Sequence, residues 1–114
     1  MDEIQVKVLQ RMIDHYEMKD FIAWLRNSDE VTVMVTVSGI RSDADQRALG
    51  RMAETVAERM FILSKDRPVP GWPSGISHED PQLMRSLEII KRLLGNKMPK
   101  RMRSNWYSEN GYRV

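Results

Sequence analysis

The fold class depends on one stretch of eight residues, Val31-Thr32-Val33-Met34-Val35-Thr36-Val37-Ser38, in which valines alternate with other side chains. A period-two pattern rich in β-branched residues is typical of a half-buried β-strand. We therefore expect a strand over residues 31–38 with its valine face buried. On the opposite face, Thr32, Met34 and Thr36 would be partly exposed or covered by another element, which makes them candidate protein-interface residues. Gly39 then permits a turn.

A lone strand needs a partner, because its backbone N–H and C=O groups are otherwise unpaired. One candidate partner is a hairpin within residues 105–114. There, Asn110-Gly111 is a favoured sequence for a two-residue type I′ turn, and Tyr107 and Tyr112 flank it. The other candidate is the same strand of a second copy, paired about a two-fold axis. The sequence leaves both pairings open.

Apolar residues at helical spacing precede the strand. Over residues 2–27 they predict one long helix, or two helices joined near residues 18–20, where the apolar face drifts. The expected inner positions are Ile4, Val8, Leu9, Met12 and Ile13.

A second helix is expected over residues 43–64, because Ser42 with Asp45 matches a capping box. Gly50 inside this helix costs about 1 kcal/mol relative to alanine, and a close backbone contact would explain its presence. The expected inner positions are Leu49, Met52, Val56, Met60 and Leu63.

Residues 65–81 are rich in proline and glycine, which disfavours a regular element there. A third helix should follow this loop. Ser77 or Asp80 can cap it, Pro81 suits its first turn, and Gly95 fits its C-terminal end. Its expected inner positions are Leu83, Leu87, Ile90 and Leu94.

The order of elements is therefore α-β-α-loop-α-β-β, which is an α+β fold with three main helices packed on a small antiparallel sheet. The sheet would consist of one central valine-rich strand and the C-terminal hairpin. A chain of 114 residues fits a single domain, 1–114. Within it lie the Pro/Gly-rich loop at 65–81 and a basic aromatic C-terminal segment at 97–114.

Composition and motifs exclude several classes of protein. Without cysteine, the chain has no disulfide framework, thiol nucleophile, zinc–thiolate site or iron–sulfur cluster. No apolar run approaches the roughly 18–20 residues that span a bilayer, and no signal peptide is expected. His15 and His78 lie far apart in sequence and form no metal-binding pair. We therefore expect a cytoplasmic protein without membrane contact, metal or cofactor, and no catalytic motif indicates an enzyme.

Charge is divided unevenly along the chain. Residues 1–82 hold 10 Lys and Arg against 14 Asp and Glu, a net charge of −4, whereas residues 83–114 hold 8 against 2, a net charge of +6. Such asymmetry suggests a basic arm for an anionic partner, or a molecule that pairs with its own copies. A solvated basic end without a partner is the plainer alternative.

The C-terminal segment holds the main candidate binding residues. Lys and Arg neutralise phosphates, while aromatic side chains stack on unpaired bases or anchor in a protein pocket. We therefore expect a small non-enzymatic binding protein, a homodimer, that engages nucleic acid, a nucleoprotein or an acidic protein surface. The candidate residues for this binding are Lys97, Lys100, Arg101, Arg103, Trp106, Tyr107 and Arg113.

Two alternative functions stay open. A protein inhibitor or adaptor, for example an accessory factor of a phage or mobile element, would use Trp72 in the 65–81 loop, because tryptophan often dominates interface energy. A protein that sequesters a small phosphorylated ligand would instead use Gly39, Arg41 and Ser42, which precede a helix N-terminus. A plain turn explains the same three residues.

Overall fold

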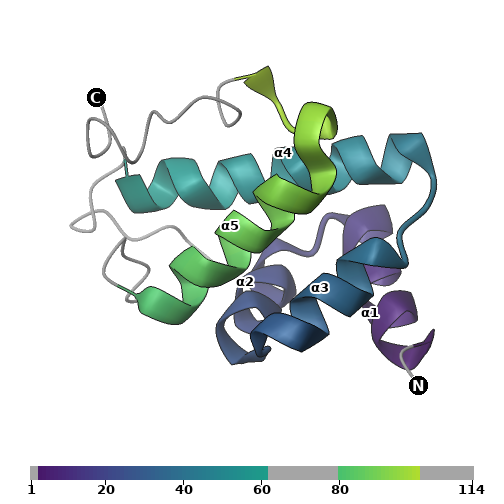
Figure 1. Ribbon diagram of the computed structural model, residues 1–114, viewed down its shortest axis with the longest axis horizontal. Coiled ribbons are helices and arrows are strands. Elements are labelled where there is room, and N and C mark those ends of the chain that lie inside the picture. The colour runs from purple at the N-terminus through teal and green to yellow at the C-terminus, as the bar shows by residue number, and fades with distance from the viewer. Residues whose placement is uncertain (1–2, 62–79, 101–114) are drawn as a thin grey trace.

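The computed structural model describes residues 3–61 and 80–100 of the chain, and within these ranges all regular structure is helical (Figure 1). None of the helices in the described part is long and apolar enough to cross a membrane. The elements are α1 (Glu3–His15), α2 (Met18–Asn27), α3 (Glu30–Ser38), α4 (Asp43–Phe61), α5 (Pro81–Leu94) and the short 3-10 helix η1 (Gly95–Lys97).

The expected valine-rich strand is wrong, because its residues form α3. Asp29 caps this helix: its side chain accepts a hydrogen bond from the backbone N–H of Thr32 at 2.8 Å. Val33 and Val37 are buried, with 0% and 2% of their surface exposed. Val31 and Val35 are exposed, at 63% and 40%.

The sequence pattern misleads here for a geometric reason. A run of alternating valines also contains valines four residues apart, and residues four apart lie on the same face of a helix. Val33 and Val37 form such a pair and supply the apolar contact that α3 needs. An aspartate just before a run of apolar residues is a helix start signal, and the alternation of the valines obscured it.

The expected α+β arrangement is therefore corrected to an arrangement of helices. The described residues contain no strand or sheet on which three helices could pack. The hairpin expected over residues 105–114 lies outside the described residues.

The first helical region consists of two helices, α1 and α2. The chain breaks at Tyr16, whose φ of +52° is a left-handed conformation that no helix can continue through. The backbone N–H of Glu17 then donates to the carbonyl oxygen of Met12 at 2.9 Å. The buried residues of α1 are Leu9, Met12 and Ile13, whereas Ile4 and Val8 are 73% and 45% exposed.

The expected inner faces of the two later helices are confirmed over the described residues. In α4, the Ser42 hydroxyl accepts a hydrogen bond from the Asp45 N–H at 3.3 Å, and in α5 Pro81 occupies the first turn. Gly95 follows α5 with a φ of +54°, as expected of a glycine at this position. The buried positions are Leu49, Met52, Val56 and Met60 of α4, and Leu83, Leu87, Ile90 and Leu94 of α5.

Helix α5 organises the packing. It crosses the middle of the molecule and packs against α2, α3 and α4, while α1 packs against α3 and α4 (Figure 1). The apolar faces of all five helices meet in one core, whose largest fully buried side chains include Phe21, Leu9 and Ile22. Burial of this core is the main source of stability, because helices in proteins gain most of their stability from the packing of their apolar faces.

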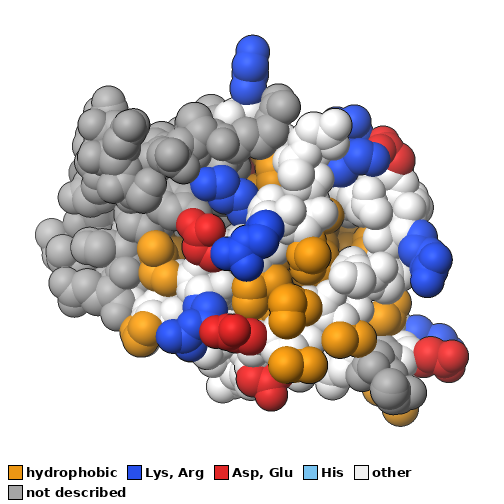
Figure 2. Space-filling model, viewed as in Figure 1, with side chains coloured by type: hydrophobic (Ala, Val, Ile, Leu, Met, Phe, Trp, Pro, Cys, Tyr) orange, Lys and Arg blue, Asp and Glu red, His pale blue; other side chains and the backbone are white. Residues whose placement is uncertain are grey.

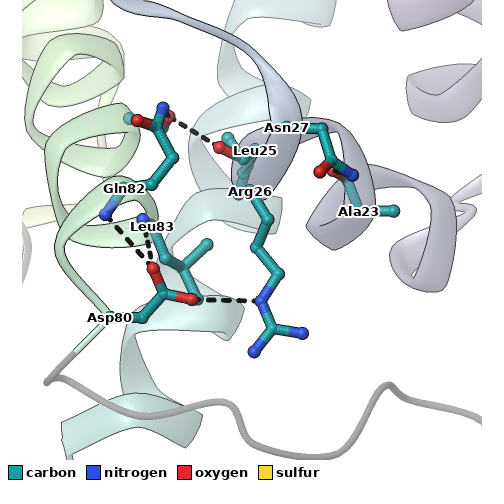
Figure 3. Close-up of polar contacts among 8 residues, drawn as sticks. Ala23, Leu25, Arg26, Asn27, Asp80, Gln82 and Leu83 are labelled. Carbon is teal, nitrogen blue, oxygen red and sulfur yellow. Dashed lines mark hydrogen bonds and ion pairs between the residues drawn. The ribbon is translucent and has the colours of Figure 1, made fainter.

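A polar seam joins the end of α2 to the start of α5 (Figure 3). Asp80 caps α5 by accepting the N–H groups of Gln82 and Leu83, both at 3.1 Å, and also pairs with Arg26 Nε at 3.1 Å. The buried Ser86 hydroxyl donates to the carbonyl oxygen of Leu25 at 2.8 Å. The seam satisfies backbone groups at two helix ends that would otherwise lose their partners on burial.

Thr36 is a buried polar residue whose hydroxyl, unlike that of Ser86, is unsatisfied within the described residues. Its side chain is 1% exposed, and its hydroxyl oxygen has no hydrogen-bond partner. We expect Thr36→Val to raise the free energy of unfolding by about 1 kcal/mol, because a methyl group replaces an unsatisfied buried hydroxyl of similar size. Urea unfolding measures the difference. A loss of stability in Thr36→Val would show that the hydroxyl is hydrogen-bonded after all.

Candidate functional site

The basic end of the described chain starts in the last turn of α5, which carries Lys91 and Arg92. Cations are favourable there in any helix, because the last carbonyl groups carry partial negative charge. The Gly95 N–H makes the last α-helical hydrogen bond, to the Lys91 carbonyl oxygen, and the positive φ of Gly95, +54°, then ends the helix. Beyond α5 the chain changes direction and forms η1.

The chain beyond α5 lies directly on α4. Met98 is 2% exposed, and a side chain added at Gly50 would place its Cβ 3.1 Å from the Lys97 carbonyl oxygen and 3.3 Å from the Met98 Cα. A Cβ at this position would crowd both backbone atoms, so the close approach favours glycine here. The contact explains Gly50 inside α4, and it fixes the point from which the C-terminal segment departs.

An ion pair holds this point in place. Lys97 Nζ donates to a carboxylate oxygen of Asp43 in the first turn of α4, and Arg47 Nε donates to the other at 2.9 Å. These two hydrogen bonds hold the pKa of Asp43 below its ordinary value, and the bond from Lys97 has the larger effect. The ion pair therefore supports the fold above the ordinary carboxyl pKa, and this support is lost as the pH falls through the lowered pKa of Asp43.

A recess lies beside the same end of α5. Its volume is about 420 Å³, and the described residues that line it are Glu88, Lys91, Arg92 and Gly95. Among the described lining residues, Lys91 and Arg92 are cations and Glu88 is a carboxylate. The wide opening suits a group on the surface of a larger molecule rather than an enclosed small ligand.

The structure places only part of the predicted anion-binding set. Lys97 is paired with Asp43, so its charge is already partly neutralised, and Lys100 is exposed. Trp72, the residue proposed for an adaptor, lies outside the described residues. So do the remaining members of the set, Arg101, Arg103, Trp106, Tyr107 and Arg113.

The predicted phosphate-binding turn is occupied by structural contacts. The Gly39 N–H donates to the Thr36 carbonyl oxygen at 3.0 Å, and the Ser42 hydroxyl is the cap of α4. Asp43 and Asp45 in the first turn of α4 would repel a phosphate placed at this N-terminus. Of the three candidate residues, only Arg41 is exposed without a pairing partner among the described residues.

The three predicted interface residues of the 31–38 stretch do not share a face once the stretch is a helix. Met34 is 39% exposed, Thr32 is half-buried and Thr36 is buried. The sequence pattern assigned Val31 and Val35 to the core, and both are exposed neighbours of Met34 on α3. The helix start signal at Asp29 could have revealed this surface. It indicates that the valines follow helical spacing rather than the period of two of a strand.

Other parts of the described chain show no arrangement typical of a catalytic or metal centre. No group of three or more His, Asp and Glu residues is placed to hold a metal ion within residues 3–61 and 80–100. A groove of about 220 Å³ between α1 and α2 is lined by Val8, Arg11, Met12, Glu17, Asp20 and Trp24. The Trp24 indole N–H donates to the Gln5 side-chain oxygen at 3.2 Å, so this tryptophan is held in place as part of the fold.

Comparison with family models, with curated proteins and with solved structures found no match.

Proposed function

We propose that this chain is a non-enzymatic binding protein that engages nucleic acid through the basic segment that follows α5. The observation that carries the proposal is the concentration of positive charge in residues 83–114, which hold 8 Lys and Arg against 2 Asp and Glu. Five of these cations follow α5: Lys97, Lys100, Arg101, Arg103 and Arg113. Neutralisation of phosphates by such a cluster releases counterions and supplies sequence-independent affinity. Trp106 and Tyr107 in the same segment add stacking surfaces for unpaired bases.

The described residues support this proposal in two ways. Lys97 and Met98, at the start of the segment, are anchored on α4. Arg92 is exposed in the last turn of α5 and lines the recess beside it. The folded part would thus present the segment next to a surface that is itself basic.

The proposal predicts that Lys100→Ala, Arg101→Ala and Arg103→Ala together weaken binding to a single-stranded DNA oligonucleotide by at least about tenfold. The slope of log affinity against log salt should fall by about 2 units, because each lost phosphate contact removes about 0.7 from it on a single strand. Fluorescence anisotropy over a salt series measures both. Unchanged affinity and slope would exclude the segment as the binding site.

A control with the same change in net charge separates a local site from a general charge effect. Lys7, Lys19 and Arg51 are exposed cations on α1, α2 and α4. Their joint replacement by alanine should leave the affinity within about threefold of the unmodified protein, since distant exposed charges are largely screened. Equal losses in both triple variants would contradict a localised site.

Asp43→Asn is expected to strengthen binding, whereas the triple alanine variant weakens it. It removes the carboxylate that pairs with Lys97 and keeps a side chain of similar shape at the start of α4. The released cation should strengthen binding to the same oligonucleotide and steepen the salt slope by up to about 0.7 units. A weaker complex would mean that the anchor of the segment contributes more to binding than the charge of Lys97.

A further inference from the structure

Helix α3 exposes an apolar surface that nothing in the described structure covers. Val31, Met34 and Val35 are 63%, 39% and 40% exposed, on the side of α3 opposite the core pair Val33 and Val37. Figure 2 shows hydrophobic side chains gathered where Figure 1 draws α3 and the adjacent edge of α5, with charged side chains at the border. An apolar patch with a charged border is typical of a protein–protein contact.

The exposed face of α3 lies around the middle of the helix. Met34 is the central residue of this nine-residue helix, with Val31 one turn before it and the small Ser38 one turn after it. A second copy related by a two-fold axis through Met34 would set the two helices antiparallel. Met34 would then contact Met34 of the second copy, and each Val31 would lie beside a Ser38, where a small side chain permits close approach.

The charges at the two ends of α3 favour the same arrangement. Asp29 and Glu30 begin the helix, whereas Arg41 lies just beyond its end and has no partner among the described residues. Antiparallel packing brings each Arg41 towards Glu30 of the second copy, and it also opposes the two helix dipoles. Glu30 already pairs with Arg85 at 2.9 Å, but a carboxylate can accept a second cation. Parallel packing would place like charges side by side.

We propose that the exposed face of α3 is a homodimer interface in which two copies pack antiparallel about Met34. A helix of this length is about 13 Å long, so its face buries less than the roughly 800 Å² per partner of a standard interface. The dimer is therefore expected to depend on concentration, with dissociation in the micromolar range.

Sedimentation velocity without nucleic acid, from about 1 µM to about 200 µM, tests the proposal across the expected dissociation constant. The unmodified chain should pass from the mass of one copy to the mass of two. Met34→Glu places two carboxylates at the two-fold axis and should remain monomeric throughout. Ile4→Glu makes the same kind of change at a more exposed apolar residue of α1, 73% exposed, and should dimerise normally. Circular dichroism verifies that both variants retain their helices.

Mixed charge variants test the orientation. Glu30→Arg and Arg41→Glu each bring like charges together in their own homodimers, so each alone should dimerise at least about tenfold more weakly. An equimolar mixture should recover dimers, because both cross-pairs are then opposite in charge. An unmodified chain that stays monomeric, a dimer that survives Met34→Glu, or a mixture no better than its components would overturn the proposal.

Discussion

Replacement of Val33 by alanine is expected to lower the free energy of unfolding by about 2 kcal/mol, whereas the same change at Val31 should alter it by less than about 0.5 kcal/mol. Val33 is fully buried, so Val33→Ala loses the transfer energy of its methyl groups and leaves a cavity. Val31 is 63% exposed, and alanine has the higher helix propensity there. Val37→Ala and Val35→Ala should repeat the contrast, since Val37 is buried and Val35 exposed.

Urea unfolding at low micromolar concentration measures the four alanine variants with little contribution from self-association. The comparison distinguishes a helix from a strand because the four valines occupy every second position of residues 31–38. In a strand they would share one buried face, and the four variants would lose similar amounts of stability. Equal losses at Val31 and Val33 would therefore contradict the helix, whereas alternating large and small losses would support it.

The same four residues show why the fold could be predicted only in part. Local signals for helix ends were sufficient at Ser42 and Gly95, and they narrowed the cap of α5 to Ser77 or Asp80, because each signal acts through its own side chain or backbone. The valine stretch is different. Its β-branched residues fit a strand or a buried helix, and the choice is made by the core residues of α1 and α5, against which α3 packs. That information lies elsewhere in the chain.

The candidate site shows a similar division. The excess of positive charge after residue 82 is visible in the sequence, because it is a count. The sequence cannot show that Lys97 is held by Asp43, because these residues are distant along the chain and meet only after α5 packs on α4. Nor could it show the exposed face of α3, because the period-two alternation assigned Val31 and Val35 to the buried face of a strand. In both cases the missing information is a tertiary contact.

Asp80→Ala is expected to lower the free energy of unfolding by about 2 kcal/mol. Asp80 accepts two backbone N–H groups at the start of α5, and removal of such a cap alone costs about 1 kcal/mol. It also pairs with Arg26 at 3.1 Å, and both side chains are largely shielded from solvent, with 22% and 27% of their surface exposed. Because α5 packs against α2, α3 and α4, fraying of its first turn should weaken the whole core rather than one end of one helix.

Two matched variants separate the cap from the ion pair. Asp80→Asn keeps an oxygen that can accept the Gln82 and Leu83 N–H groups but removes the charge, so it should lose about half as much stability as Asp80→Ala. Arg26→Gln removes the other charge and leaves the cap intact. If the ion pair contributes, the double variant Asp80→Asn/Arg26→Gln should lose less stability than the sum of the two single losses, because the partner of the second residue is already absent.

Urea unfolding of these variants measures the coupling free energy between Asp80 and Arg26. Strict additivity would assign the whole effect of Asp80 to capping, and an Asp80→Ala protein as stable as the original would show that the α2–α5 seam does not hold the start of α5.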